Sequence, residues 1–95
     1  MDKLLEALEK LYNEQNNSYV CEGDGKSYFE NNDVVDEVRS LCNEFLITSA
    51  GLCNVDNIDI LRRNGYRVFA GEKDWFGWLT GCVQKKNDPR ILVYG

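Results

Sequence analysis

The sequence predicts an α+β fold: two to three helices packed on one face of an antiparallel sheet of three strands, or of up to five, ending in a C-terminal β-meander. Apolar residues recur at helical spacing in the first half of the chain, whereas strand-forming residues are concentrated after Tyr66. No repeat, low-complexity segment or linker separates the two parts. We therefore expect residues 1–95 to form a single domain.

Two helices are expected in the first half of the chain. The first begins at Asp2, which can cap it, and ends before the polar run 13–18. Its buried stripe is predicted to contain Leu4, Leu5, Leu8, Leu11 and Tyr12. The second follows a cap at Asn32 or Asp33, and Gly51 marks its end or the loop just beyond. Its buried stripe is predicted to contain Val34, Val35, Val38, Leu41, Cys42, Phe45 and Leu46.

Two shorter segments complete this part of the chain. Residues 18–30 contain two strand-forming pieces around the turn Gly23-Asp24-Gly25, which predicts either a hairpin or a loop. A third, short helix is expected from about Asp56, which acts as its cap, to Asn64-Gly65, where the glycine favours a helix end.

The last third of the chain predicts three antiparallel strands. Residues Tyr66–Ala70 alternate in polarity, the turn-forming residues 71–74 follow, and a long β-rich run extends from Trp75 to Gln84. The polar run 85–89, which contains the chain's one proline, predicts a tight reversal before the final strand Ile91–Tyr94.

Alternation along the middle strand assigns its side chains to two faces. One face contains Trp75, Gly77, Leu79, Gly81 and Val83, and the other contains Phe76, Trp78, Thr80, Cys82 and Gln84. Because glycine lets a helix or a large side chain come close, we expect the face with Leu79 to meet the helices. Phe76 and Trp78 then lie on the opposite face, either beneath residues 19–29 or toward solvent.

Composition and charge restrict the class of protein. With 43% apolar and 28% charged residues, the chain is expected to be globular. No apolar run approaches the about 20 residues of a membrane helix, and residues 1–10 do not resemble a signal peptide. The four cysteines fit reduced thiols, so we expect a cytoplasmic protein. The net charge of −5 divides into −9 over residues 1–59 and +4 over residues 60–95, which fits solvated faces, attraction between the two halves or a charged partner.

The sequence lacks the residues of several common chemistries. It contains no histidine, which excludes Ser-His and Cys-His nucleophile pairs and removes the commonest metal ligand. The cysteines lie 21, 11 and 29 positions apart, unlike the close pairs of zinc sites. The acidic residues fall mostly on the polar faces of the predicted helices, where they are solvated. We therefore expect no enzymatic activity, no cofactor and no metal site.

Aromatic and basic residues in the last third are the candidates for binding. Tryptophan, tyrosine and arginine often anchor protein interfaces, although large aromatics are equally suited to closing a small core. The candidate residues are Trp75, Phe76, Trp78, Tyr66, Arg63 and Arg67. The acidity of the whole chain disfavours nucleic acid as a partner, and an acidic helical face that mimics DNA is a further alternative.

Residues 71–81, Gly-Glu-Lys-Asp-Trp-Phe-Gly-Trp-Leu-Thr-Gly, and the strand that follows at 91–95 resemble the C-terminal part of uncharacterised small proteins carried by phages and mobile elements of Firmicute-type gut bacteria. The resemblance implies a regulator or inhibitor that binds a host protein. The leading hypothesis is therefore a non-enzymatic protein that binds a macromolecular partner through its aromatic-rich sheet or its acidic helical face. The alternative is a protein that binds a small anionic ligand at Arg62, Arg63 and Arg67. This alternative includes both a monomeric and an oligomeric protein.

Overall fold

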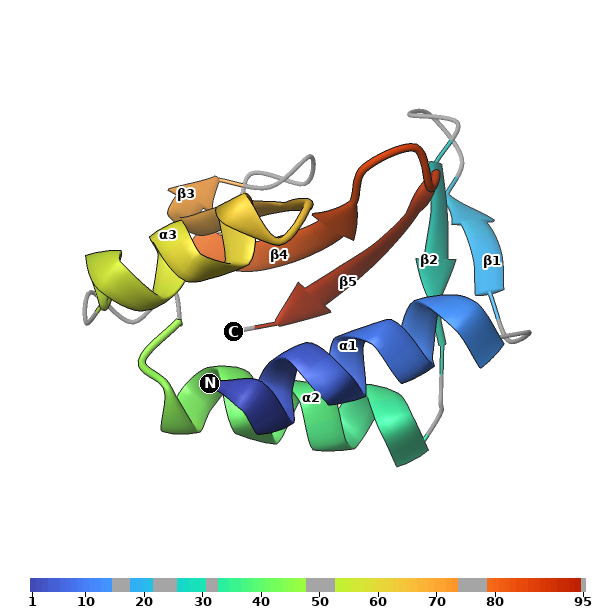
Figure 1. The fold of residues 1–95 in the computed structure, drawn as a ribbon. Coiled ribbons are helices and arrows are strands. Elements are labelled where there is room, and N and C mark those ends of the chain that lie inside the picture. The colour runs from blue at the N-terminus through green and yellow to red at the C-terminus, as the bar shows by residue number, and fades with distance from the viewer. Residues whose placement is uncertain (15–17, 22–25, 31–32, 48–52, 74–78, 95) are drawn as a thin grey trace.

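The computed structural model describes residues 1–14, 18–21, 26–30, 33–47, 53–73 and 79–94, and within them it contains three helices and five strands (Figure 1). In chain order these elements are α1 (Asp2–Glu14), β1 (Ser18–Cys21), β2 (Lys26–Phe29), α2 (Asp33–Glu44), α3 (Val55–Arg63), β3 (Tyr66–Lys73), β4 (Leu79–Lys85) and β5 (Arg90–Tyr94). The predicted α+β class is confirmed. No helix in the described ranges has the length and apolar character needed to cross a membrane.

The strands form one sheet in the order β1-β2-β5-β4-β3. β3, β4 and β5 form the predicted antiparallel meander, and β1 and β2 form a hairpin, the first of the two alternatives for residues 18–30. β2 pairs in parallel with β5, however, with Ser27 opposite Arg90 and Tyr28 opposite Ile91. The prediction of a purely antiparallel sheet is therefore wrong, and the sheet is mixed.

β5 joins the two parts of the sheet because different parts of its length pair with different neighbours. Arg90 and Ile91 pair with β2, whereas Leu92–Tyr94 pair with β4. A parallel pair needs a long crossover connection. Here α2, α3, β3 and β4 together make that crossover between β2 and β5.

The three helices pack against the same face of the sheet, as predicted. Figure 1 shows α1 and α2 side by side beneath β5. The shared core contains Leu4, Leu8 and Leu11 of α1, Val35, Val38 and Cys42 of α2, Ile58 and Leu61 of α3, and Phe29, Tyr66, Val68, Val83, Leu92 and Tyr94 of the sheet. Burial of these apolar side chains is the main stabilising contribution to the fold.

β4 confirms the predicted division of faces in the part that is described. Val83 packs in the core with the helices, whereas Cys82 belongs to a buried cluster on the opposite face with Tyr28 and Ile91. Gly81 lies opposite Tyr94 of β5, and a Cβ atom at this glycine would overlap the Tyr94 ring. The close approach that the glycine permits is made by a tyrosine of the neighbouring strand.

The ends of β3 and β4 differ from the prediction. β3 continues to Lys73, so residues 71–73 belong to a strand and not to a turn. The register of β3 against β4 shifts between Phe69 and Glu72, which accommodates these residues as a bulge. The predicted start of the middle strand, with Trp75, Phe76 and Trp78, lies outside the described residues.

α2 ends earlier than predicted, in a left-handed residue. The backbone amide of Ile47 donates to the Cys42 carbonyl at 2.8 Å and that of Leu46 to the Asn43 carbonyl at 3.1 Å, the pattern of a Schellman C-cap. Leu46 has φ of 56° and is 46% exposed, so its predicted place in the buried stripe is wrong. For a non-glycine residue, this left-handed conformation has a conformational energy about 1–2 kcal/mol higher than the right-handed one. Gly51 lies outside the described residues.

α3 has well-defined caps at both ends. Its N-cap is Asn54, and not Asp56 as predicted, because the Asn54 Oδ1 accepts a hydrogen bond from the Asn57 amide at 3.2 Å. Its C-cap is Asn64, and Gly65 follows with φ of 89°, which confirms the predicted helix end.

Candidate binding surfaces

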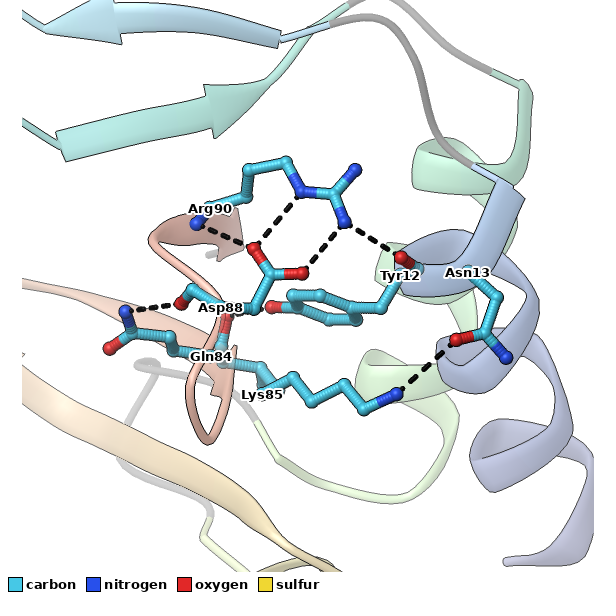
Figure 2. Close-up of polar contacts among 7 residues, drawn as sticks. Tyr12, Asn13, Gln84, Lys85, Asp88 and Arg90 are labelled. Atoms are coloured by element: carbon cyan, nitrogen blue, oxygen red, sulfur yellow. Dashed lines mark hydrogen bonds and ion pairs between the residues drawn. The ribbon is translucent and has the colours of Figure 1, made fainter.

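Arg90 connects the β4–β5 turn to the end of α1 (Figure 2). Its Nε and Nη2 donate to Oδ1 and Oδ2 of Asp88 at 3.0 and 2.7 Å, and Nη2 also donates to the Tyr12 carbonyl at 2.7 Å. The Arg90 backbone amide donates to Oδ1 of Asp88 at 2.9 Å. The last carbonyls of a helix have no partner within the helix, so Arg90 satisfies one of them with a positive charge at the C-terminus of α1.

Tyr12 is the second anchor of this junction. Its hydroxyl donates to the Val83 carbonyl at 2.7 Å, and its ring meets that of Phe29 edge-on with centroids 4.8 Å apart. The Arg90 guanidinium lies over the Phe29 ring, 5.0 Å from its centroid. We refer to Tyr12, Asp88 and Arg90 as the junction network.

The charges of the junction network neutralise one another. Burial alone would raise the pKa of Asp88, but hydrogen bonds from the side chain and backbone of Arg90, with the charges of Arg90 and Lys85, lower it overall. The hydrogen bond to Asp88 raises the pKa of Arg90. Burial raises the pKa of Tyr12, so its phenol stays protonated and remains a donor. We therefore assign the network a structural role.

A small polar groove lies beside the junction network, with a volume of about 190 Å³. It is lined by Leu5, Glu9, Asn64, Tyr66 and Lys85. Burial and, secondarily, the charge of Glu9 raise the pKa of Tyr66. Lys85 is held in place because its Nζ donates to Oδ1 of Asn13 at 3.3 Å (Figure 2). Pockets for small molecules usually have about 300–1,000 Å³, so this groove is small for such a site.

The exposed surface of α1 and α2 is rich in carboxylates. The exposed carboxylates are those of Asp2, Glu6, Glu9, Glu14, Asp33, Asp36, Glu37 and Glu44. The exposed basic residues of these two helices are Lys3, Lys10 and Arg39. We refer to this surface as the acidic helical face. Among the described residues, its one ion pair joins Asp36 to Arg39 at 4.0 Å.

A second groove lies on the acidic helical face between the two helices. Its volume is about 240 Å³. It is lined by Lys3, Glu6, Ala7, Lys10, Glu37 and Leu41. The groove therefore combines an apolar lining, from Ala7 and Leu41, with charges of both signs.

The structure separates the residues that the sequence predicts as a binding site. Tyr66 is 6% exposed and packs in the core with the helices. Arg63, at the end of α3, and Arg67, in β3, are exposed and line neither groove. Arg62 donates from Nη2 to the Val68 carbonyl at 2.9 Å. Outside the described residues lie Trp75, Phe76 and Trp78.

The described cysteines do not form a reactive or metal-binding cluster. Cys42 and Cys82 are buried, and Cys53 is exposed. Burial raises the pKa of the Cys42 thiol to about 12, which keeps it in its unreactive, protonated form. Within the described ranges, no three Cys, Asp or Glu side chains gather where they could hold a metal ion.

The junction network was not predicted from the sequence. Asp88 falls in a predicted turn, and Tyr12 falls in a predicted buried stripe. The contact between Arg90 and Tyr12 spans 78 positions, which no local pattern encodes. The local signal was the aspartate two residues before Arg90, since such a side chain often accepts a hydrogen bond from the backbone amide two positions on.

Comparisons with protein-family models, with curated proteins and with solved structures found no match for this chain. The function is therefore inferred from the surfaces of the chain itself.

Proposed function

We propose that this chain is a non-enzymatic binding protein that contacts a protein partner through the acidic helical face. In the setting that the sequence resemblance implies, it acts in the cytoplasm as a regulator or inhibitor of a host protein. The observation that carries the proposal is the side-by-side packing of α1 and α2, two helices that together expose eight carboxylates.

Two of these carboxylates, Glu6 and Glu37, form no ion pair with a described residue, and the core beneath the two helices is apolar. A concentration of like charge destabilises a compact chain through self-repulsion. A basic partner surface would relieve that repulsion on binding, so the charge favours association.

The groove on the acidic helical face suits a side chain of a partner better than a small molecule. Its volume of about 240 Å³ lies below the roughly 300–1,000 Å³ of most small-molecule pockets. A lysine or arginine of the partner would lay its apolar stem against Ala7 and Leu41 and direct its charge toward Glu6 or Glu37. We therefore expect a partner surface rich in lysine and arginine.

Matched neutralisations test this proposal. The double variant Glu6→Gln/Glu37→Gln removes the two carboxylates that line the groove, and Glu14→Gln/Glu44→Gln removes two exposed carboxylates of the same helices that do not line it. Each exposed charge pair with the partner contributes about 0.2–1 kcal/mol. Loss of two such pairs should weaken binding of the partner by the groove variant roughly two- to thirtyfold.

The measurement is the amount of partner that each variant retains from host-cell lysate as the salt concentration is raised. The wild-type chain should lose its partner with increasing salt, because surface charge pairs are screened. Equal retention by the groove variant and by the wild-type chain, with unchanged thermal stability, would contradict the proposal.

A small anionic ligand is the second candidate. The exposed Arg63 and Arg67 support it, since neither forms an ion pair with a described residue. The variant Arg63→Glu/Arg67→Glu should then lose an anionic ligand and keep the protein partner. Retention of the ligand by this variant would exclude these arginines as its site.

A further inference from the structure

β3 is an outermost strand of the sheet, and its outer edge has backbone groups that face away from β4. The Lys86 amide donates to the Gly65 carbonyl at 2.9 Å, and Arg67 and Phe69 lie opposite Gln84 and Cys82. Backbone groups of successive residues in a strand point to opposite sides. Up to the bulge after Phe69, the amides and carbonyls of Tyr66 and Val68 therefore point outward.

An arginine side chain occupies this edge at Val68. Nη2 of Arg62 donates to the outward carbonyl of Val68 at 2.9 Å. A similar contact is found on β5, in the part that does not pair with β2. There, Nε of Arg39 donates to the Val93 carbonyl at 2.9 Å. Unpaired strand edges are templates for another strand, and positively charged side chains are a common way of covering them.

α3 and β3 together carry three exposed arginines. Arg62, Arg63 and Arg67 are exposed, and none of them forms an ion pair with a described residue. Phe69 lies two residues from Arg67, so the two side chains share a face of the sheet. Phe69 is 39% exposed, one of the few large apolar side chains of the described residues that reach solvent.

We propose that the outer edge of β3 binds an extended acidic segment of a partner protein by strand addition. An amide of the segment replaces Arg62 as the donor to the Val68 carbonyl, and the Val68 amide donates to a carbonyl of the segment. Arg62 is then free to pair, with Arg63 and Arg67, with carboxylates of the segment. The opposite charge of this edge makes it a second surface, independent of the acidic helical face.

A synthetic peptide tests strand addition directly. The probe is acetylated and amidated Val-Glu-Val-Glu-Val-Glu, and its controls are the same peptide with lysine for glutamate and the same peptide with alternate amides N-methylated. We expect the first peptide to bind and to slow hydrogen exchange of the Tyr66 and Val68 amides roughly tenfold or more. The Arg67 and Phe69 amides face β4 and should change little.

Matched variants separate the local charges from the overall charge. Arg63→Gln/Arg67→Gln should weaken binding of the acidic peptide roughly two- to thirtyfold. Lys3→Gln/Lys10→Gln removes two exposed positive charges from α1 and should leave the binding unchanged, and all four residues are exposed, so both variants should fold.

Three results would overturn the proposal. The first is no binding at about 1 mM peptide. The second is binding that N-methylation does not weaken or that leaves exchange of the Val68 amide unchanged, since contact would then be made by side chains alone. The third is a chain that dimerises without peptide and protects the same amides, which would make a second copy the occupant of the edge.

Discussion

Replacing Arg90 with lysine tests whether the junction network holds α1 against the sheet. Lysine keeps the positive charge, but it has one ammonium group in place of a planar fork of donors. It cannot bond both oxygens of Asp88 and the Tyr12 carbonyl and also lie flat over the Phe29 ring. The substitution therefore removes the hydrogen-bonding geometry of the guanidinium and leaves the charge at this position unchanged.

The expected loss follows from the contacts. The Arg90 side chain makes three charge-assisted hydrogen bonds with Asp88 and Tyr12. The side chains of Arg90 and Asp88 are 21% and 16% exposed, so solvent screens their attraction only in part. If lysine keeps one bond and each lost bond contributes about 1–1.5 kcal/mol, the free energy of unfolding should fall by about 2–3 kcal/mol.

Urea denaturation at neutral and acidic pH measures both the size and the origin of this loss. The folded-state pKa of Asp88 is lowered, so its contribution to stability is present above its unfolded value of about 4 and is lost as the pH falls through the folded value. The difference in stability between the wild-type chain and Arg90→Lys should therefore narrow as the pH falls below about 4. Arg63→Lys, at an exposed arginine, is the control and should change stability by less than about 0.5 kcal/mol. The role of the network would be refuted if Arg90→Lys changed the free energy of unfolding by less than about 0.5 kcal/mol. It would also be refuted if the difference in stability between Arg90→Lys and the wild-type chain did not depend on pH.

Substitutions at three further positions test single structural features by chemical denaturation. Leu46→Gly should raise the free energy of unfolding by about 0.5–1 kcal/mol because glycine relieves the left-handed strain, whereas Leu46→Ala should not. Gly81→Ala should lower it by about 1–3 kcal/mol, since the added methyl overlaps the Tyr94 ring; wild-type stability would mean that the ring moves freely. Tyr12→Phe should lower it by about 1–2 kcal/mol because a buried strand carbonyl loses its donor, and a neutral result would show that the bond contributes little.

Local patterns were sufficient to predict the helices and the meander. The spacing of Leu4, Leu8 and Leu11 defines the buried stripe of α1, and Asn64-Gly65 defines the end of α3. Alternation correctly placed Val83 toward the helices. Each of these signals lies within a few residues of the feature that it predicts.

The features that could not be predicted depend on contacts between distant parts of the chain. Ser27 and Tyr28 pair in parallel with Arg90 and Ile91, and no residue pattern in either strand specifies that partner. Leu46 has the spacing of a buried helical residue, but the C-cap geometry of α2 turns it toward solvent. Arg62 was predicted to bind an anionic ligand because it lies in a run of arginines. In the structure its guanidinium instead donates a hydrogen bond to the Val68 carbonyl at the edge of β3.

The claim that the acidic helical face binds a protein partner is tested most directly by an intact native mass spectrum of the chain, purified gently from its host cells. We predict a stoichiometric complex of the wild-type chain with a second protein. The Glu6→Gln/Glu37→Gln variant should form less of this complex, and the Glu14→Gln/Glu44→Gln variant should form an amount closer to that of the wild-type chain. A bare monomer, or a chain that carries only a small-molecule adduct, would contradict the claim.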